Sequence, residues 1–393
     1  MASSASQEGE ERKAFIAELM REHSRLGHDS NNFVYRLKLS VSDSLPVSRP
    51  SHYRRPGTVT LPADATDAVI RISNPHALVN ENVRVQNEVA AMSLMRDALA
   101  GEWEDLVPRV YAWSPSSEGR EWIVQEYKQG VQLDKLFGDL GPESQRDVVR
   151  QVVPVYKLIQ NYQLSVFADH VVTGPTTIPC GGPFDTLLDM YARMLRRLLD
   201  ESDTSDRLKG WRQNSRRERL EHFAPHGIVR QTRDSCAPDT FNMLFNPSSN
   251  RVTALLDFDF SHVTSPADEY FYSLRTFGAL LIGPFEDGDE GLLRTCLLEG
   301  FGGKVPSEPD GKGRANWTVA VMMDEERHRA GPLRPADIIH GRGELAALYW
   351  FLEDVSLPYF FMSRWVESRK PEDIDNIHRS ISKSLDRYLA RWA

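Results

Sequence analysis

The sequence predicts an α+β fold, in which a small lobe of mixed sheet and helix precedes a larger, mainly helical lobe. Three observations support this prediction. Residues 1–130 show the order strand, strand, helix, strand, strand; the rest of the chain is mainly helical; and one β-hairpin, within 241–260, interrupts the helical part. We expect an N-terminal lobe over residues 1–128 and a helical C-terminal lobe over residues 129–393.

Apolar side chains that recur at every second position predict the strands of the first lobe. Four segments have the length and composition of strands: 31–40 (NNFVYRLKLS), 67–73 (DAVIRIS), 107–115 (VPRVYAWSP) and 121–130 (EWIVQEYKQG). In the first of them, Phe33, Tyr35 and Leu37 would share one buried face. The intervening residues 41–66 contain several prolines, which favour an irregular connection.

Helical spacing of apolar residues predicts two helices in the first lobe. One spans 11–26 and would end at Gly27, a residue typical of helix C-termini. The other spans 81–99, and its apolar stripe consists of Val85, Val89, Met92 and Met95. In the second lobe the same periodicity predicts helices over 145–163, 184–200 and 344–367.

The composition is that of an ordinary soluble globular chain, with 40% hydrophobic and 26% charged residues among 393. No apolar run reaches the roughly 18 residues that a membrane-spanning helix needs, and the polar N-terminal segment lacks the apolar core of a secretion signal. The three cysteines are widely separated, which suits neither a zinc site nor a disulfide framework. We therefore expect a cytoplasmic protein without a membrane partner.

The charge balance argues against a nucleic-acid partner. The chain has 47 basic and 56 acidic residues, a formal net charge of −9, whereas nucleic-acid binding requires a basic surface. The arginine-rich stretch 211–222 is the candidate for such a surface. Acidic and basic residues alternate just before it, so we interpret the stretch as a solvated helical face.

The hairpin brings together residues that could bind a metal ion. Asn242 precedes its first strand and Asp257 follows its second, so the amide and carboxylate oxygens would face one space. Both are the hard oxygen donors that Mg²⁺ prefers. Asp259 projects to the same side of an extended segment and could make a second metal or substrate contact. The alternative interpretation is a solvated cap and two exposed turn acids.

The layout and the segment 241–271 resemble the aminoglycoside phosphotransferase family of the protein-kinase-like superfamily. In that family an H-x-D-x-x-x-x-N loop precedes a hairpin; the loop Asp is the base, and the Asn and a later Asp bind metal. Asn242 and Asp257 match the last two positions, 15 residues apart. Asp268 matches a structural Asp that opens a helix. The resemblance implies a two-lobed kinase-like fold, with ATP and Mg²⁺ as cofactors.

The first lobe supports the resemblance. Kinase-like proteins pair a strand cation with a helix glutamate to hold the nucleotide phosphates, and Arg71 and Glu88 match this pair. Arginine replaces the usual lysine; it keeps the charge and can contact phosphate through two hydrogen bonds. The segment 123–130 matches the link between the lobes, where backbone groups of Glu126 to Lys128 would contact adenine. The loop 27–32 would cover the phosphates.

The loop before Asn242 departs from the family pattern. Counting back, the family Asp falls on Ala237, which cannot accept a proton, and the His falls on Ser235. Two nearby carboxylates could replace the base. Asp234 lies eight residues before Asn242 in a Thr-Arg-Asp sequence, and Asp239 lies three residues before it. A rebuilt loop within the region 232–260 would bring one of them to the site.

Three functions are compatible with these residues. The first is Mg-ATP-dependent phosphorylation of a hydroxyl group on a small molecule. The second is a degenerate, non-catalytic binding protein, as Ala237 suggests. The third is a Mg²⁺-dependent lyase or cyclase that acts on a diphosphate substrate and needs no hydroxyl base. In that case the aromatic residues of 349–365 would line an apolar pocket; ordinary core packing is the alternative.

Overall fold

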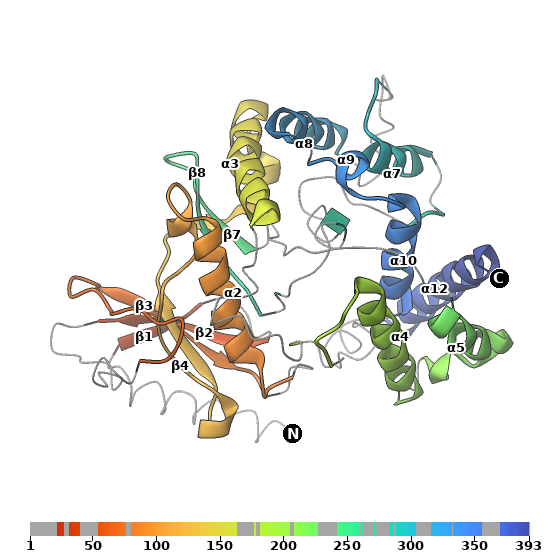
Figure 1. The fold of residues 1–393 in the computed structure, drawn as a ribbon, viewed down its shortest axis with the longest axis horizontal. Coiled ribbons are helices and arrows are strands. Elements are labelled where there is room, and N and C mark those ends of the chain that lie inside the picture. The colour runs from red at the N-terminus through yellow and green to blue at the C-terminus, as the bar shows by residue number, and fades with distance from the viewer. Residues whose placement is uncertain are drawn as a thin grey trace. The chain divides into compact units, whose positions relative to one another are not determined.

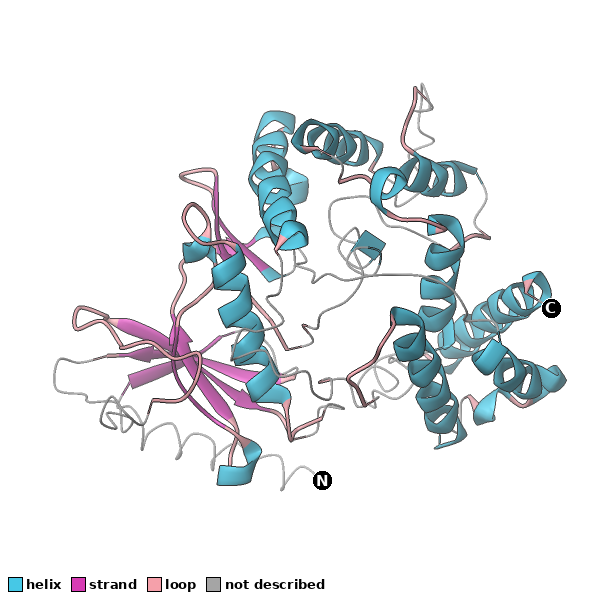
Figure 2. Ribbon diagram, in the orientation of Figure 1, coloured by secondary structure: helices cyan, strands magenta, loops and turns pink. Residues whose placement is uncertain are grey.

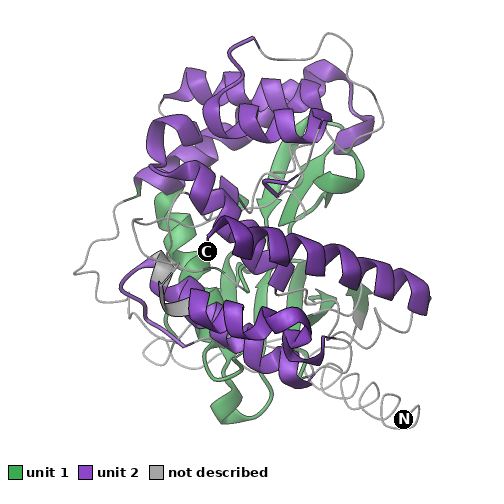
Figure 3. Ribbon diagram, turned by 90° about the vertical axis from the view of Figure 1, so that its right-hand side faces the viewer, with its two compact units in different colours: residues 1–136, 162–179, 242–262 green, residues 137–161, 180–241, 263–393 purple. Residues whose placement is uncertain are grey.

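The structure is a computed structural model of the chain. It describes residues 22–26, 31–39, 54–75, 80–162, 177, 181–204, 208–226, 242–259, 261, 267, 270–271, 283–285, 288–303, 316–331, 333–355 and 370–392. The chain divides into two compact units, shown in green and purple in Figure 3. The first comprises residues 1–136, 162–179 and 242–262, and the second comprises 137–161, 180–241 and 263–393. The division at residue 128 stays a prediction.

A five-stranded antiparallel sheet forms most of the first unit (Figure 1). Its strands, in spatial order, are β1 (Glu22–Leu26), β2 (Asn32–Lys38), β3 (Asp67–Ser73), β5 (Trp122–Glu126) and β4 (Val110–Ser114). The four strands that the sequence predicts are present. The central strand β3 is buried on both faces, because Ile70 and Ile72 pack in one apolar cluster while Val69 and Arg71 point to the opposite face.

Helix α2 (Arg84–Ala98) lies along the sheet, as Figure 2 shows. Its predicted stripe is buried and consists of Val85, Val89, Met92 and Met95. The glutamate of this helix, Glu88, forms an ion pair with Arg71 of β3, so the helix is tied to the sheet by charge as well as by apolar packing. The predicted packing of this helix on an antiparallel sheet is confirmed.

The predicted helix over 11–26 is wrong at its C-terminal end. Residues Glu22–Leu26 form strand β1, which pairs in antiparallel register with β2 from Glu22↔Lys38 to Leu26↔Val34. Helical spacing of Leu19 and Leu26 suggested a helix, but pairing with a long neighbouring strand supplies the backbone hydrogen bonds of this segment instead. Residues 11–21 and Gly27 lie outside the described residues.

The predicted hairpin is confirmed as β7 (Met243–Asn246) and β8 (Arg251–Leu255). Its turn is held by the side chain of Asn246, whose Oδ1 accepts a hydrogen bond from the backbone N–H of Ser248 at 2.9 Å. A third strand, β6 (Val131–Gln132), pairs with β7 and was not predicted because two residues show no periodicity. Gly130, directly before β6, lies against the hairpin. A Cβ at this position would lie only 2.8 Å from the Cβ of Leu244.

The second unit is helical. Its α-helices, within the described residues, are α3 (Pro142–Asn161), α4 (Leu187–Thr204), α5 (Arg216–His226), α7 (Gly288–Glu299), α8 (Trp317–Ala330), the short α9 (Pro335–Ile338), α10 (Arg342–Val355) and α12 (Pro371–Arg391). Short 3₁₀ turns occur in both units at Glu104–Leu106, Ser116–Glu118, Leu133–Lys135, Phe137–Asp139, Lys209–Trp211 and Gln213–Ser215. The helices predicted over 145–163 and 184–200 are confirmed as α3 and α4.

Helices α4, α5, α10 and α12 share one aromatic core. The ring centroid of Phe351 lies 5.5 Å from that of Tyr388 and 5.3 Å from that of Trp392. The described part of the aromatic segment, residues 349–355, is therefore core packing. This result favours the alternative to the apolar pocket that the sequence suggested. Among the described residues, no helix combines the length and apolar character needed to cross a bilayer.

Candidate functional site

Arg71 lies at the centre of a buried ionic cluster in the first unit. Its side chain is 9% exposed, and its Nη1 donates to Oε1 of Glu88 on α2. Its Nη2 donates to Oδ1 of Asp257 at 3.1 Å and to Oδ1 of Asp259 at 3.2 Å. The predicted contact between Arg71 and Glu88 is thus present. The same guanidinium also contacts both acidic residues that follow the hairpin, which the sequence did not predict.

A second arginine, Arg84 at the start of α2, belongs to the same cluster and is fully buried. Its Nη2 donates to the backbone oxygen of Asn31 at 2.6 Å, to Oδ1 of Asn32 at 3.0 Å and to Oδ2 of Asp259 at 3.1 Å. Asn32 in turn donates from Nδ2 to Asp259 Oδ2 at 2.7 Å. Sequence reasoning missed Arg84, although its position four residues before Glu88 places both on one helix face.

The hairpin positions Asn242 and Asp257 at one end. Met243 is paired with Leu255, and the N–H of Leu256 donates to the backbone oxygen of Asn242 at 2.6 Å. Asp257 follows with a φ of 62°, a left-handed conformation that is uncommon for residues other than glycine. Its side chain is 45% exposed. It is therefore accessible to a ligand while it contacts Arg71.

Burial and charge set the protonation of the cluster. Burial opposes the charged form of Arg71, but Glu88, Asp259 and Asp257 outweigh it and raise its pKa. Burial raises the pKa of Glu88 well above its ordinary value, although Arg71 opposes this effect. For Asp259 burial acts in the same direction, but Arg71, Glu88 and Arg84 together hold its pKa below the ordinary value. The negative charge is therefore held on Asp259, and Glu88 is the carboxyl that retains a proton more readily.

The residues at the end of the hairpin fit a Mg²⁺ ion held together with phosphate groups. Mg²⁺ is commonly bound by one or two carboxylates plus water and substrate phosphates, and seldom by protein ligands alone. Asp257 offers an exposed carboxylate, and Asn242 can offer an amide oxygen. Among the described residues, no three His, Cys, Asp or Glu side chains form a group that could hold a metal by themselves.

Asp259 differs from Asp257 in its surroundings. It is fully buried, and both of its oxygens accept hydrogen bonds from Asn32, Arg84 and Arg71. A metal contact of Asp259 stays a prediction.

The segment expected to contact adenine has its side chains in local contacts. The N–H of Glu126 donates to the backbone oxygen of Arg109 at 2.8 Å, and its carboxylate accepts from the N–H of Arg109 and from Nζ of Lys128. Tyr127 lies between Glu126 and Lys128 in the sequence, and the guanidinium of Arg36 is 4.1 Å from the centroid of its ring. Contacts of Glu126 and Lys128 with a nucleotide stay predictions.

Several predicted positions lie outside the described residues. These are the two candidate bases Asp234 and Asp239, the altered loop positions Ser235 and Ala237, the structural Asp268, and residues 27–30 of the proposed phosphate-covering loop. The prediction that Asp234 or Asp239 replaces the missing base therefore stays a prediction.

The arginine-rich stretch 211–222 is neutralised by acidic partners in the second unit. Each of its four arginines forms an ion pair: Arg212 with Asp203, Arg216 with Asp386, Arg217 with Asp203 and Glu221, and Arg219 with Asp386. The interpretation as a solvated face is wrong for Arg216, which is buried against α12. The expected absence of a nucleic-acid partner stays a prediction.

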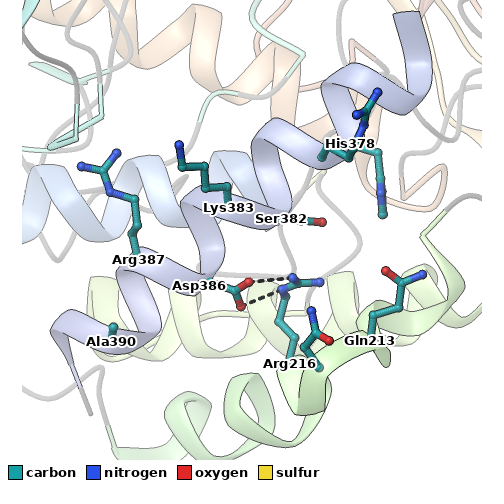
Figure 4. A pocket seen from close by; sticks show the side chains of 10 residues that line it. Gln213, Arg216, His378, Ser382, Lys383, Asp386, Arg387 and Ala390 are labelled. Carbon is teal, nitrogen blue, oxygen red and sulfur yellow. Dashed lines mark hydrogen bonds and ion pairs between the residues drawn. The ribbon is translucent and has the colours of Figure 1, made fainter. Parts of the chain in front are cut away.

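The pair of Arg216 and Asp386 lines an open depression of about 530 Å³ between α5 and α12 (Figure 4). The side chains of Lys383 and Arg387 point away from this pair, as Figure 4 shows. The positive charges around the depression therefore do not converge on one point, and we assign no ligand to it.

Comparisons with known proteins agree with the fold. The model of the phosphotransferase enzyme family, APH, matches residues 58–298, more than half of the chain. None of the curated proteins compared with the sequence matches it.

Three solved structures of aminoglycoside phosphotransferases are similar to the chain. A thermostable mutant of APH(4)-Ia, in a ternary complex with AMP-PNP and hygromycin B, has a TM-score of 0.50 and 12% identity, over 96% of this chain and 97% of that chain. ADP-bound APH(2'')-Ib has a TM-score of 0.50 and 11% identity, over 96% and 98%. The complex of APH(2")-IIa with gentamicin has a TM-score of 0.50 and 12% identity, over 95% of each chain.

At these identities the structural likeness shows the fold, and it confirms the predicted α+β, protein-kinase-like class. The family match extends from before β3 to α7, so it includes Arg71, Glu88, Asn242 and Asp257. The chain therefore belongs to the phosphotransferase enzyme family, APH.

Proposed function

We propose that the protein transfers the γ-phosphoryl group of ATP to a hydroxyl group of a small molecule, and that the reaction depends on Mg²⁺. Membership of the phosphotransferase family supports transfer of a phosphoryl group. One structural observation supports this site for it: the guanidinium of Arg71 is held between buried Glu88 and exposed Asp257. A fixed cation beside an accessible carboxylate is what a metal-bound nucleotide phosphate requires.

Arg71 would contact the nucleotide phosphates. Glu88 and Asp259 hold its guanidinium from the buried side, so little ordering of the side chain is left to occur on binding. An arginine also presents several N–H groups in one plane and can contact two phosphate oxygens at once. The departure from lysine at this position is therefore compatible with phosphate binding.

Asn242 and Asp257 would hold the metal ion. When bound, Mg²⁺ would neutralise the charge that develops on the phosphate oxygens during transfer. In the structure Asp257 accepts a hydrogen bond from Arg71 through Oδ1. Arg71 and Asp257 therefore lie side by side. The guanidinium would contact a phosphate group, and the carboxylate would contact the metal ion bound to that phosphate. Glu126 and Lys128 would present backbone groups to adenine.

The acceptor hydroxyl would be oriented and deprotonated by Asp234, with Asp239 as the second choice. A general base typically contributes about 10²–10⁴-fold to the rate, whereas phosphoryl transfer depends mostly on positioning and charge neutralisation. The lyase alternative relied on an apolar pocket near 349–365, and the described part of that segment packs in the core instead. We therefore do not propose it.

The proposal is tested by measuring phosphorylated product and ADP with Mg-ATP and a panel of hydroxylated small molecules. The panel includes hygromycin B and gentamicin, since similar structures contain them. We expect turnover of at least one compound, and Asp234→Asn should lower kcat by about 10²-fold or more, beyond the effect of Asp239→Asn. The control is Asp105→Asn, which changes an exposed aspartate.

Two outcomes would contradict parts of the proposal. Nucleotide binding without turnover of any compound would favour a non-catalytic binding protein. Full activity of both aspartate variants would show that neither residue is the base.

A further inference from the structure

We propose that Arg84 and Asp259 are positioning residues, which form a buried clamp that holds Arg71 and Asp257 in place for the nucleotide phosphates. The proposal rests on the function proposed above. It assigns a role to Arg84, which sequence reasoning missed. It also assigns to Asp259 a role in the clamp in place of direct metal binding.

The first argument is burial. Arg84 and Asp259 are both fully buried, at 0% exposure, whereas Asp257 two residues away is 45% exposed. A ligand that contacts Asp257 and Arg71 at the surface of the cluster does not reach the two clamp residues. They would therefore act through their neighbours and would not touch the substrate.

The second argument is that the oxygens of Asp259 are already engaged. Oδ2 accepts hydrogen bonds from Asn32 at 2.7 Å and from Arg84 at 3.1 Å, and Oδ1 accepts one from Arg71 at 3.2 Å. Both lone pairs of Oδ2 are engaged, so a metal ion at Oδ2 would displace a buried hydrogen bond, and a metal ion at Oδ1 would lie beside the positive charge of Arg71. Loss of that hydrogen bond would leave a buried donor without its acceptor, at about 1–3 kcal/mol. The carboxylate that is free to turn toward a ligand is Asp257.

The third argument is what the clamp connects. Through Nη2, Arg84 binds the backbone oxygen of Asn31 and the side chain of Asn32, both at the start of β2. Through Asp259 it reaches the segment that follows β8. Since Arg84 itself opens α2, one guanidinium joins a strand, a helix and the segment with Asp257. The three acceptors share the two N–H groups of Nη2, and the planar guanidinium holds this nitrogen in a fixed orientation, which an ammonium group on a flexible stem does not do equally well.

The charge balance of the cluster predicts how loss of Arg84 would change nucleotide binding. Asp259 lies between two arginines, with Arg84 at 3.1 Å and Arg71 at 3.2 Å. Without Arg84, Arg71 would be the remaining cation in contact with Asp259, and the two would be drawn closer together. Arg71 would then be less available to Asp257 and to phosphate. We therefore expect that loss of Arg84 weakens nucleotide binding although no contact with the nucleotide is removed.

The test compares Arg84→Lys and Arg84→Met with a matched variant on the same helix. Arg96 also lies on α2 and holds structure by donating to the backbone oxygens of Glu104 at 3.0 Å and Val107 at 2.7 Å. Neither of these contacts involves the cluster, so Arg96→Met controls for loss of helix stability alone. All variants are measured at a temperature where urea unfolding shows each of them to be folded.

Isothermal titration calorimetry with Mg-ATP gives the nucleotide affinity, and steady-state rates give KM and kcat separately. We expect Arg84→Met to weaken nucleotide affinity by roughly tenfold or more, and Arg84→Lys to give an intermediate value because charge is kept. Arg96→Met should bind within about twofold of the unmodified protein, whatever its stability. Asp259→Asn should weaken nucleotide affinity to the same extent as Arg84→Met. It provides the test if the Arg84→Met protein does not fold.

The outcomes separate the clamp from the proposed function. The clamp is refuted, and the proposed function stands, if Arg84→Met and Asp259→Asn both bind Mg-ATP as tightly as the unmodified protein does. If the Arg84 and Arg96 variants lose affinity only in proportion to stability, the role of Arg84 is structural. If the unmodified protein binds no nucleotide, the proposed function is refuted, and the clamp with it.

Discussion

Replacing Arg71 with glutamine should destabilise the protein by about 3–5 kcal/mol at pH 8, the usual result of removing one partner of a buried ion pair. The magnitude follows from the surroundings. Glu88 and Asp259 are buried to 2% and 0% exposure, so water cannot replace the lost cation. Asp257 is exposed and should contribute little to the loss. The substitution keeps a polar side chain of moderate size, so the effect reports mainly on charge.

The loss should depend on pH with a definite sign. Without the arginine, the pKa of Glu88, which burial already raises above that in the unfolded chain, rises further, and the pKa of Asp259 rises because one of the cations that lower it is lost. A raised pKa in the folded state stabilises at low pH and loses this effect as pH rises. The variant should therefore be closer to the unmodified protein at about pH 5 than at pH 8.

The assay is urea unfolding of both proteins at about pH 5, 6.5 and 8, with Arg109→Gln as the control. Arg109 forms an exposed ion pair with Asp105, and exposed pairs contribute about 0–1 kcal/mol. The reasoning is refuted if Arg71→Gln destabilises no more than this control does. A large loss that is the same at every pH would show that packing, and not charge, explains it.

Two further changes test other parts of the structure. The carboxyl of Glu121 is buried, which raises its pKa to about 8, with a smaller contribution from Glu81. The free energy of unfolding should therefore fall as pH rises toward 8, by at most ~1.4 kcal/mol per pH unit. Glu121→Gln should remove this slope in urea unfolding. Parallel pH profiles of the unmodified protein and the variant would contradict the prediction. Gly130→Ala should destabilise the protein by about 1–3 kcal/mol, because the new Cβ would lie 2.8 Å from both Leu244 Cβ and Thr253 Oγ1. The control is Gly138→Ala, whose new Cβ would meet open space. This control should change stability by less than about 0.5 kcal/mol. Equal effects of the two alanine variants would refute the close approach at Gly130.

Local patterns predicted those elements in which one periodicity dominates. Helix α2 has a single apolar stripe, and the hairpin has two apolar runs separated by a polar turn. The contact between Arg71 and Glu88 was predicted because a strand cation and a helix acid have fixed places in a kinase-like fold. These features depend on few residues and on short distances along the chain.

Features that depend on distant partners could not be predicted in the same way. Strand β1 is stabilised by pairing with β2, and its own sequence has helical spacing. The partners of Asp259 come from positions 227 and 175 residues away, at Asn32 and Arg84. A buried charge shows itself in sequence only as an ordinary charged residue, and its burial follows from the fold.

The central claim is that Asn242 and Asp257 form a metal-dependent nucleotide site, and thermal unfolding with ATP tests it most directly. A ligand that binds only the folded protein stabilises it by about 2.7 kcal/mol at a hundred times its Kd. ATP should raise Tm slightly without Mg²⁺ and clearly with it, and Asp257→Ala should abolish the difference. Asp105→Ala should leave it unchanged. If ATP with Mg²⁺ raises Tm equally in the unmodified protein and in Asp257→Ala, the assignment of the site is wrong.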